Sequence, residues 1–225
     1  MKIAVISDIH LGLGDHKDAF EHDDFDFLTF LSYLERNFER IILLGDIWET
    51  LTVPPHERLG QFRKAQAAHK EIAQRFKKQQ YTYVLGNHDL VAERAIGALS
   101  EYILEVDGMR LLFAHGHQSD FWCHQARSVS ESLVRLGTWL KSKGLKAVHQ
   151  AAEGLEASRN SGNHWMKKWA FAREADIVVT GHTHLADKEE RASRLFLNSG
   201  HCDHGNFSFL ALDTRALSFD VHRGF

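Results

Sequence analysis

Five short hydrophobic segments of the chain are each followed directly by a motif of polar residues and glycine. They lie at residues 3–6, 41–44, 81–85, 111–114 and 177–180. Apolar, β-branched runs of this length that end at such motifs are typical of buried strands. Between the first three segments, apolar residues recur at helical spacing from Phe27 to Phe38 and, less regularly, from Leu59 to Phe76. This strand–helix–strand alternation predicts an α/β (α+β) fold with right-handed crossovers and a partly parallel sheet.

The pattern changes after Arg191 to short strands separated by turns. The strands are expected at residues 194–197, 207–212 and 217–221. We expect them to form a second, largely antiparallel sheet that packs on the first. A chain of 225 residues can bury one substantial core, so residues 1–225 are expected to form a single domain.

Residues 118–174 interrupt this pattern and are predicted to form a helical basic cap inserted into the domain. Between Cys123 and Arg173 there are nine Lys and Arg against three Glu, a balance of +6, whereas the whole chain has a formal net charge of -3. Such a cap would attract an anionic substrate, although a solvated helical face is an alternative. Its residues Trp139, Trp165 and Trp169 could stack on bases or pack in a core.

Composition indicates a cytoplasmic globular protein, and a peripheral contact with a membrane stays open. Hydrophobic residues make up 44% and charged residues 25% of the chain. The first ten residues contain only five apolar residues before Asp8, which favours a first strand over a signal peptide. No apolar run approaches the length of a membrane span, and Cys123 and Cys202 are too few for a disulfide framework.

The motifs that follow the five predicted strands are rich in metal-ligand side chains. These are Asp8, His10, Asp46, Asn87, His88, Asp89, His115, His117, His182 and His184. Side chains beyond the carboxyl ends of neighbouring strands converge in space. Imidazole, carboxylate and amide ligands without thiolate suit Mn, Fe, Zn or Co, and so many ligands predict two cations about 3.5–4 Å apart. Each motif alone could be a simple turn, but their coincidence after five strands indicates a site.

In this order, the motifs SDIH, GDIWE, GNHD, HGH and GHTH resemble those of the calcineurin-like metallophosphoesterases, over residues 2–212. The resemblance implies a four-layer sandwich of two packed mixed β-sheets flanked by helices. It also implies two divalent metal ions, with Mn favoured and Fe, Zn, Co or Mg as alternatives. One ion would be held by Asp8, His10 and His184, the other by Asn87, His115 and His182, and Asp46 would bridge both.

The same resemblance assigns His88 as a non-ligand that contacts the phosphate and protonates the leaving group. It places Glu49 where a carboxylate orients that histidine, although Glu49 could instead be a helix-start residue. A metal-bridging hydroxide would be the nucleophile. His201, beside the turn at residues 198–200, is a candidate substrate contact, and His117 either contacts substrate or orients the metal site. A third metal at residues 201–204 is a less favoured alternative.

The motif GDIWE, the stretch HGHQSD and the helical insertion resemble the UDP-2,3-diacylglucosamine hydrolase group, whose GNRD is GNHD here. We therefore expect a phosphodiesterase or pyrophosphatase acting on a nucleotide, a nucleotide-lipid or a nucleic acid. The alternatives are a DNA or RNA nuclease, a phosphomonoesterase, and a catalytically inactive protein-binding scaffold. The sequence leaves the oligomeric state open.

Overall fold

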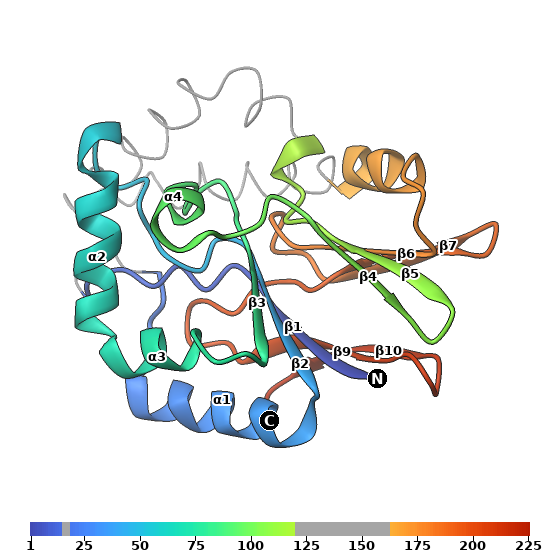
Figure 1. The fold of residues 1–225 in the computed structure, drawn as a ribbon, viewed down its shortest axis with the longest axis horizontal. Helices are drawn as coiled ribbons and strands as arrows, with labels where there is room; N and C mark the ends of the chain where they lie inside the picture. The colour runs from blue at the N-terminus through green and yellow to red at the C-terminus, as the bar shows by residue number, and fades with distance from the viewer. Residues whose placement is uncertain (15–18, 120–162) are drawn as a thin grey trace, which may run out of the picture.

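Two five-stranded β-sheets face each other in the computed structural model, which describes residues 1–14, 19–119 and 163–225 (Figure 1). The first sheet has the order β10-β9-β1-β2-β3 and the second has the order β4-β5-β6-β8-β7. Both sheets are mixed, because parallel strands at their centres are joined by antiparallel neighbours. The expected pair of mixed sheets is confirmed.

The first sheet is built from the two ends of the chain. Its parallel strands are β1 (Lys2–Ile6), β2 (Arg40–Leu44) and β3 (Tyr81–Val84). The strands β9 (Ser208–Asp213) and β10 (Ser218–Arg223) complete it, with β9 antiparallel to β1. The C-terminal strands therefore fix one side of the strand that carries the first polar motif.

The second sheet comes from the middle of the chain. Its strands are β4 (Tyr102–Val106), β5 (Met109–Phe113), β6 (Ile177–Thr180), β7 (Asp187–Arg191) and β8 (Arg194–Asn198). Strands β5, β6 and β8 run parallel, and β4 and β7 form antiparallel edges. The polar motifs after β5 and β6 therefore leave the same end of this sheet.

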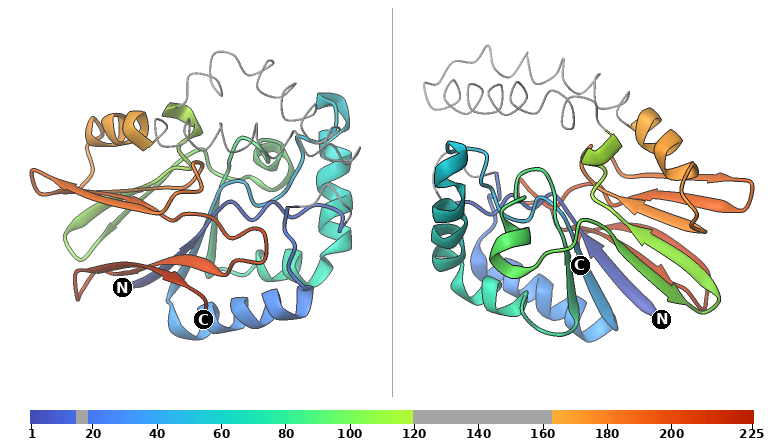
Figure 2. Two further views of the ribbon diagram at one scale, coloured as in Figure 1. Left: turned by 180° about the vertical axis from the view of Figure 1, so that it is seen from behind. Right: turned by 45° about the horizontal axis from the view of Figure 1, so that its top comes forward.

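Helices cover the outer faces of both sheets (Figure 2). The helices are α1 (Asp24–Asn37), α2 (Arg58–Ala68), α3 (Lys70–Arg75), α4 (Ala92–Ile96) and a helix at residues 163–171, which covers the second sheet, with short 3₁₀ helices η1 (Pro55–Glu57) and η2 (His117–Ser119). Helix α1 is capped by the preceding residue Asp23, whose carboxylate accepts a hydrogen bond from the Phe25 N–H at 2.8 Å. The second predicted stripe is divided at His69 into α2 and α3.

The alternation of side chains along each strand produces three hydrophobic clusters between four layers. The two sheets pack on each other through residues such as Val5 and Leu44 of the first sheet and Phe113 and Val179 of the second. On the far side of the first sheet, α1, α2 and α3 cover a larger cluster. Residues 163–171 are helical and cover the second sheet, where Met166 is buried. Helix, sheet, sheet and helix form the expected sandwich.

The prediction of a separate antiparallel sheet after Arg191 is wrong. Strand β8 lies parallel beside β6 in the second sheet, whereas β9 and β10 join the first sheet. The local pattern marked these strands correctly, but the pairings of β8 with β6 and of β9 with β1 leave no local signal. The edge strands β4 and β7 were not predicted, because no residue of either is buried.

The predicted cap at residues 118–174 lies mostly outside the described residues. Within the described part, residues 163–171 are helical and pack on the second sheet through Met166 and Ala170. No helix among the described residues is both long enough and apolar enough to cross a membrane.

Candidate metal centre

The loops that follow β1 and β6 bring three predicted ligands together. The Nε2 atom of His184 lies 3.3 Å from Asp8 Oδ1 and 3.4 Å from His10 Nε2. A single cation could bind all three, because one ligand atom from each lies within 4.8 Å of the others. These are the three residues that the resemblance assigned to one ion.

A second group forms where the loops after β2, β5 and β6 meet. Asp46, His115 and His182 again offer ligand atoms within 4.8 Å of one another. The Nε2 atom of His115 lies 3.2 Å from Asp46 Oδ2 and 3.9 Å from Asp8 Oδ1. The two groups are therefore adjacent, and Asp46 also belongs to a cluster with His10 of the first group and with His88.

Three ligand atoms in this region are buried without a hydrogen-bond partner among the described residues. They are Asp8 Oδ1, Asn87 Oδ1 and His115 Nε2. Leaving a buried polar atom unsatisfied typically costs about 1–3 kcal/mol. A pair of divalent cations would satisfy all three atoms, so the residues present fit a dinuclear centre.

The other polar side-chain atoms of Asp8 and His115 make hydrogen bonds within the protein. Asp8 Oδ2 accepts hydrogen bonds from the Ser7 hydroxyl at 2.5 Å and from the His182 N–H at 3.1 Å. The Nδ1 atom of His115 lies 2.8 Å from the Leu44 carbonyl oxygen, to which it donates. Such contacts fix each side chain and direct its free atom toward a metal.

The ligand loops have an unusual backbone conformation. Positive φ angles between 52° and 70° occur at Asp8, His10, Asp46, His182 and His184. Non-glycine residues rarely adopt this left-handed region, and such strain, of order 1–3 kcal/mol per residue, concentrates at functional sites. The residues with positive φ angles turn the chain sharply after β1, β2 and β6. The successive candidate ligands therefore come close together.

The glycines of the motifs are required by close approach. A Cβ on Gly86 would lie 2.1 Å from Asp46 Oδ1, and one on Gly181 would lie 2.6 Å from Asp8 Oδ2. Both distances are far shorter than real contacts allow. Only glycine lets these loops pass so close to the ligand carboxylates.

The partly buried His88 and the buried Glu49 form a pair beside His10 and Asp46. His88 Nδ1 lies 2.6 Å from Glu49 Oε2, and His10 Nδ1 lies 3.3 Å from the same oxygen. Glu49 Oε1 accepts the Leu51 N–H at 2.7 Å, so the carboxylate is fixed. Burial lowers the pKa of His88, but Glu49 and Asp46 outweigh it and raise that pKa to about 10. Nearby cations would lower it again, because they repel the imidazolium.

Asp89 of the GNHD motif has a structural role that the sequence did not reveal. Its Oδ2 accepts hydrogen bonds from the Ile47 N–H at 2.8 Å and the Tyr83 hydroxyl at 2.7 Å, and its Oδ1 accepts the Gly86 N–H at 2.6 Å. The completely buried carboxylate of Asp89 therefore joins the loop after β2 to the loop after β3. The loop after β2 carries Asp46 and Glu49, and the loop after β3 carries Asn87 and His88.

The two predicted substrate contacts lie at the margin of the centre. The ring of His117, in η2, has its centroid 5.6 Å from that of His115. The ring of His201, in the loop after β8, has its centroid 5.3 Å from that of His184. The alternative third metal at residues 201–204 is not supported as a four-residue set. Burial raises the pKa of the Cys202 thiol to about 12, and the cluster that forms contains only His184, His201 and Asp203 among the described residues.

The described part of the predicted cap binds acidic partners within the protein. Lys167 Nζ lies 2.7 Å from Asp187 Oδ2 and 3.0 Å from Glu189 Oε2, and Arg173 pairs with Glu101. Trp169 packs against the cluster on the outer face of the second sheet, as the core alternative predicted. The other cap lysines and arginines, apart from Lys168, lie outside the described residues.

Two facing mixed sheets with His and Asp clusters at their strand ends define a metallophosphoesterase type of protein. Residues 1–216 match the family model of the calcineurin-like phosphoesterase superfamily domain, so the chain belongs to that family. The family typically binds divalent metals, and the His and Asp clusters described above could hold them. The family also indicates a phosphoester as the substrate.

Similarity to one solved structure, with a TM-score of 0.50, supports the same fold. A single mutant of Vps29 from Entamoeba histolytica is similar, with a TM-score of 0.50 and 16% identity, covering 100% of this chain and 98% of its own. A novel archaeal phosphodiesterase is similar with a TM-score of 0.47 and 18% identity over 100% of both chains. A predicted phosphoesterase from Streptococcus pneumoniae TIGR4 has a TM-score of 0.46 and 16% identity, over 99% and 97% of the chains. No curated protein matches this chain.

Proposed function

We propose that this protein hydrolyses a phosphodiester or pyrophosphate bond with a pair of divalent cations. The observation that carries the proposal is the set of buried, unpartnered ligand atoms on Asp8, Asn87 and His115, which lies beside the Glu49–His88 pair. Two adjacent cations would supply an activated water and stabilise the charge that develops on the phosphoryl oxygens. The chain's own residues then supply orientation and proton transfer.

In this proposal Asp46 would hold both cations, since it clusters with His115 and His182 of the second group and, together with His88, with His10 of the first. His10 and His184 complete the first group with Asp8, and His182 and Asn87 complete the second with His115. His88 Nε2 lies 3.9 Å from Asp46 Oδ2 and therefore close to the proposed centre. With its Nδ1 held by Glu49, His88 is placed to donate a proton from Nε2 to the leaving oxygen. His117 and His201 are the proposed substrate contacts at the margin.

For the substrate, we propose a nucleotide-containing diester or pyrophosphate of the UDP-2,3-diacylglucosamine type. The motifs GDIWE and HGHQSD and the insertion at residues 118–174 support it. The proposed role of the insertion is a basic cap over an anionic substrate. Lys167 is already paired with Asp187 and Glu189. We therefore assign the contact with substrate to other basic residues of the insertion.

We expect hydrolysis of bis-p-nitrophenyl phosphate to exceed that of p-nitrophenyl phosphate when Mn²⁺ is added. Removal of metal with a chelator should abolish the activity, because the ligand side chains alone cannot activate water, and Mn²⁺ should restore it. The measurement is release of p-nitrophenolate from each ester with a fixed set of divalent ions. A preference for the monoester would indicate a phosphomonoesterase, and no turnover with any ion would indicate a protein-binding scaffold.

A further inference from the structure

A buried carboxylate behind the first ligand group faces two histidines at once. Asp203 lies in the loop after β8 and is only 1% exposed. Its Oδ2 lies 3.5 Å from His184 Nδ1, and its Oδ1 accepts a hydrogen bond from His201 Nδ1. The backbone of this loop is fixed, since the Asp203 carbonyl oxygen accepts the Asn206 N–H at 2.9 Å and the Cys202 N–H donates to the Ser7 carbonyl at 3.1 Å.

This contact determines how His184 faces the ligand group. With Nδ1 toward Asp203, its other nitrogen, Nε2, points to Asp8 Oδ1 at 3.3 Å and to His10 Nε2 at 3.4 Å. A carboxylate at Nδ1 favours the tautomer that carries its proton there, which leaves the lone pair on Nε2 for a cation. Asp203 thereby fixes both the ring orientation and the nitrogen that binds.

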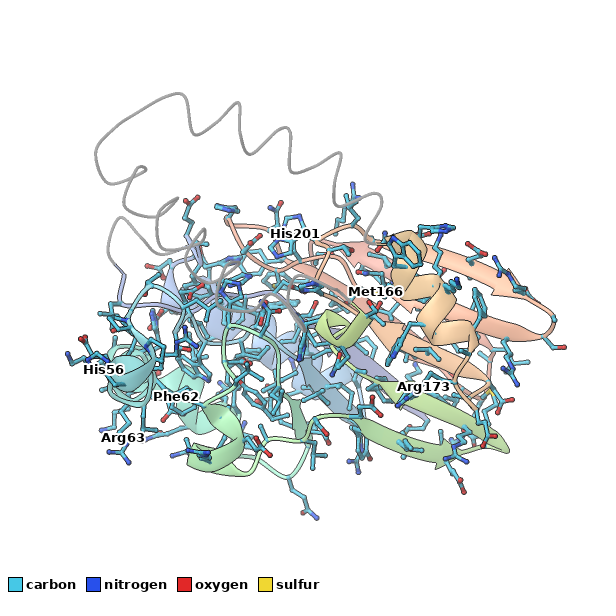
Figure 3. The ribbon with its side chains drawn as sticks, turned by 90° about the horizontal axis from the view of Figure 1, so that it is seen from above. His56, Phe62, Arg63, Met166, Arg173 and His201 are labelled. Atoms are coloured by element: carbon cyan, nitrogen blue, oxygen red, sulfur yellow. The ribbon has the colours of Figure 1, made fainter. Side chains whose placement is uncertain are left out.

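The same carboxylate aligns His201 with His184. The two rings are stacked, with an interplanar angle of 17° and centroids 5.3 Å apart. Both rings approach one carboxylate through Nδ1, so Asp203 holds His201 beside His184 at the margin of the first ligand group. The side chain of His201 is 33% exposed, which leaves it accessible to a ligand. In the view of Figure 3, His201 lies near the upper edge of the described side chains.

We infer that Asp203 is a positioning residue that sets His184 for the first cation and His201 for a substrate bound beside that cation. This inference rests on the proposed dinuclear centre. His201 then provides a polar contact to the phosphoester. Asp203 itself would contact neither the phosphate nor the first cation. The His184 ring would separate it from that cation, because Asp203 lies at Nδ1 and the cation would lie at Nε2. A carboxylate behind a ligating histidine typically changes metal affinity or activity by about 10- to 100-fold.

The inference is tested by titrating Mn²⁺ into the metal-free full-length protein and measuring bound Mn²⁺ by calorimetry and elemental analysis. Asp203→Asn should weaken the binding of one of two Mn²⁺ ions by about 10- to 100-fold. His201→Ala should leave both Mn²⁺ affinities unchanged and raise the KM for bis-p-nitrophenyl phosphate more than it lowers kcat. Asp203→Glu, which keeps the charge, should recover part of the lost affinity. The matched control is Glu21→Gln. The carboxylate of Glu21 is half exposed and lies 3.3 Å from His204, which belongs to the same loop as Asp203.

Equal Mn²⁺ affinity in the wild type and in Asp203→Asn would overturn the inference. Binding of three Mn²⁺ ions, falling to two in His201→Ala, would overturn it as well, because His184, His201 and Asp203 would then form a metal site of their own. If Asp203→Asn does not fold, the Mn²⁺ affinity of Asp203→Glu is compared with that of the wild type. Weaker binding of one Mn²⁺ ion by Asp203→Glu supports the inference, and equal affinity overturns it. A wild type that binds no Mn²⁺ would instead refute the proposed dinuclear centre.

Discussion

Replacing His88 by Ala is expected to lower kcat by about 100- to 10,000-fold, the usual contribution of a positioned general acid. Both cations should stay bound, because the proposal assigns neither of them to His88, which nevertheless offers a ligand atom near His10 and Asp46. The Nδ1 atom of His88 is 2.6 Å from Glu49 Oε2, which leaves Nε2 for the leaving oxygen. The measurements are kcat for a phosphodiester with an alkyl leaving group and the Mn²⁺ content of the variant.

The dependence on the leaving group separates proton donation from a general disturbance. A good leaving group such as p-nitrophenolate needs little protonation, whereas an alkoxide needs much. The defect of His88→Ala should therefore grow from a nitrophenyl ester to an alkyl ester of the same phosphate. His56→Ala, which removes a histidine whose side chain is 79% exposed, is the matched control. An equal defect on all esters, or loss of Mn²⁺ from His88→Ala, would contradict the assigned role.

The sequence was sufficient to predict the ligand loops because each follows a buried strand. Hydrophobic runs such as 3–6 and 177–180 are local signals, and parallel strands end at one edge of a sheet. The structure accordingly brings Asp8, Asp46 and His184 into adjacent clusters. The pairing of β9 with β1 could not be predicted in this way, since it joins the two ends of the chain.

The supporting interactions of the site were also hidden in the sequence. Asp203 was visible only as one member of a polar run, and its position behind His184 depends on where β8 inserts in the second sheet. The role of Asp89 depends similarly on its contacts with the loop after β2, with β3 and with the loop after β3. The positive φ angles of Asp8 and Asp46 are unfavourable for these residue types. Local propensity could not predict them, because surrounding contacts impose them.

Replacing Gly86 by Ala is expected to damage the metal centre without changing any ligand. The added Cβ would lie 2.1 Å from Asp46 Oδ1 and 2.3 Å from the Asp46 backbone nitrogen, so the backbone as well as the side chain must move. A displacement of about 1 Å in a catalytic group can lower activity about 100-fold. Overpacking of this kind should also lower the free energy of unfolding by about 1–3 kcal/mol. Mn²⁺ titration, kcat and urea unfolding measure the three effects.

Gly60→Ala is the matched control because Gly60 lies inside α2 with no atom within 4 Å of an added Cβ. Alanine in a helix interior should raise the free energy of unfolding by about 0.5–1 kcal/mol, with Mn²⁺ affinity and kcat unchanged. The two substitutions add the same methyl group, so the opposite signs of their effects would isolate the contact with Asp46. Normal Mn²⁺ binding by Gly86→Ala would show that the loop relaxes away from Asp46. It would also show that the close approach of Gly86 is not what holds the bridging carboxylate in place.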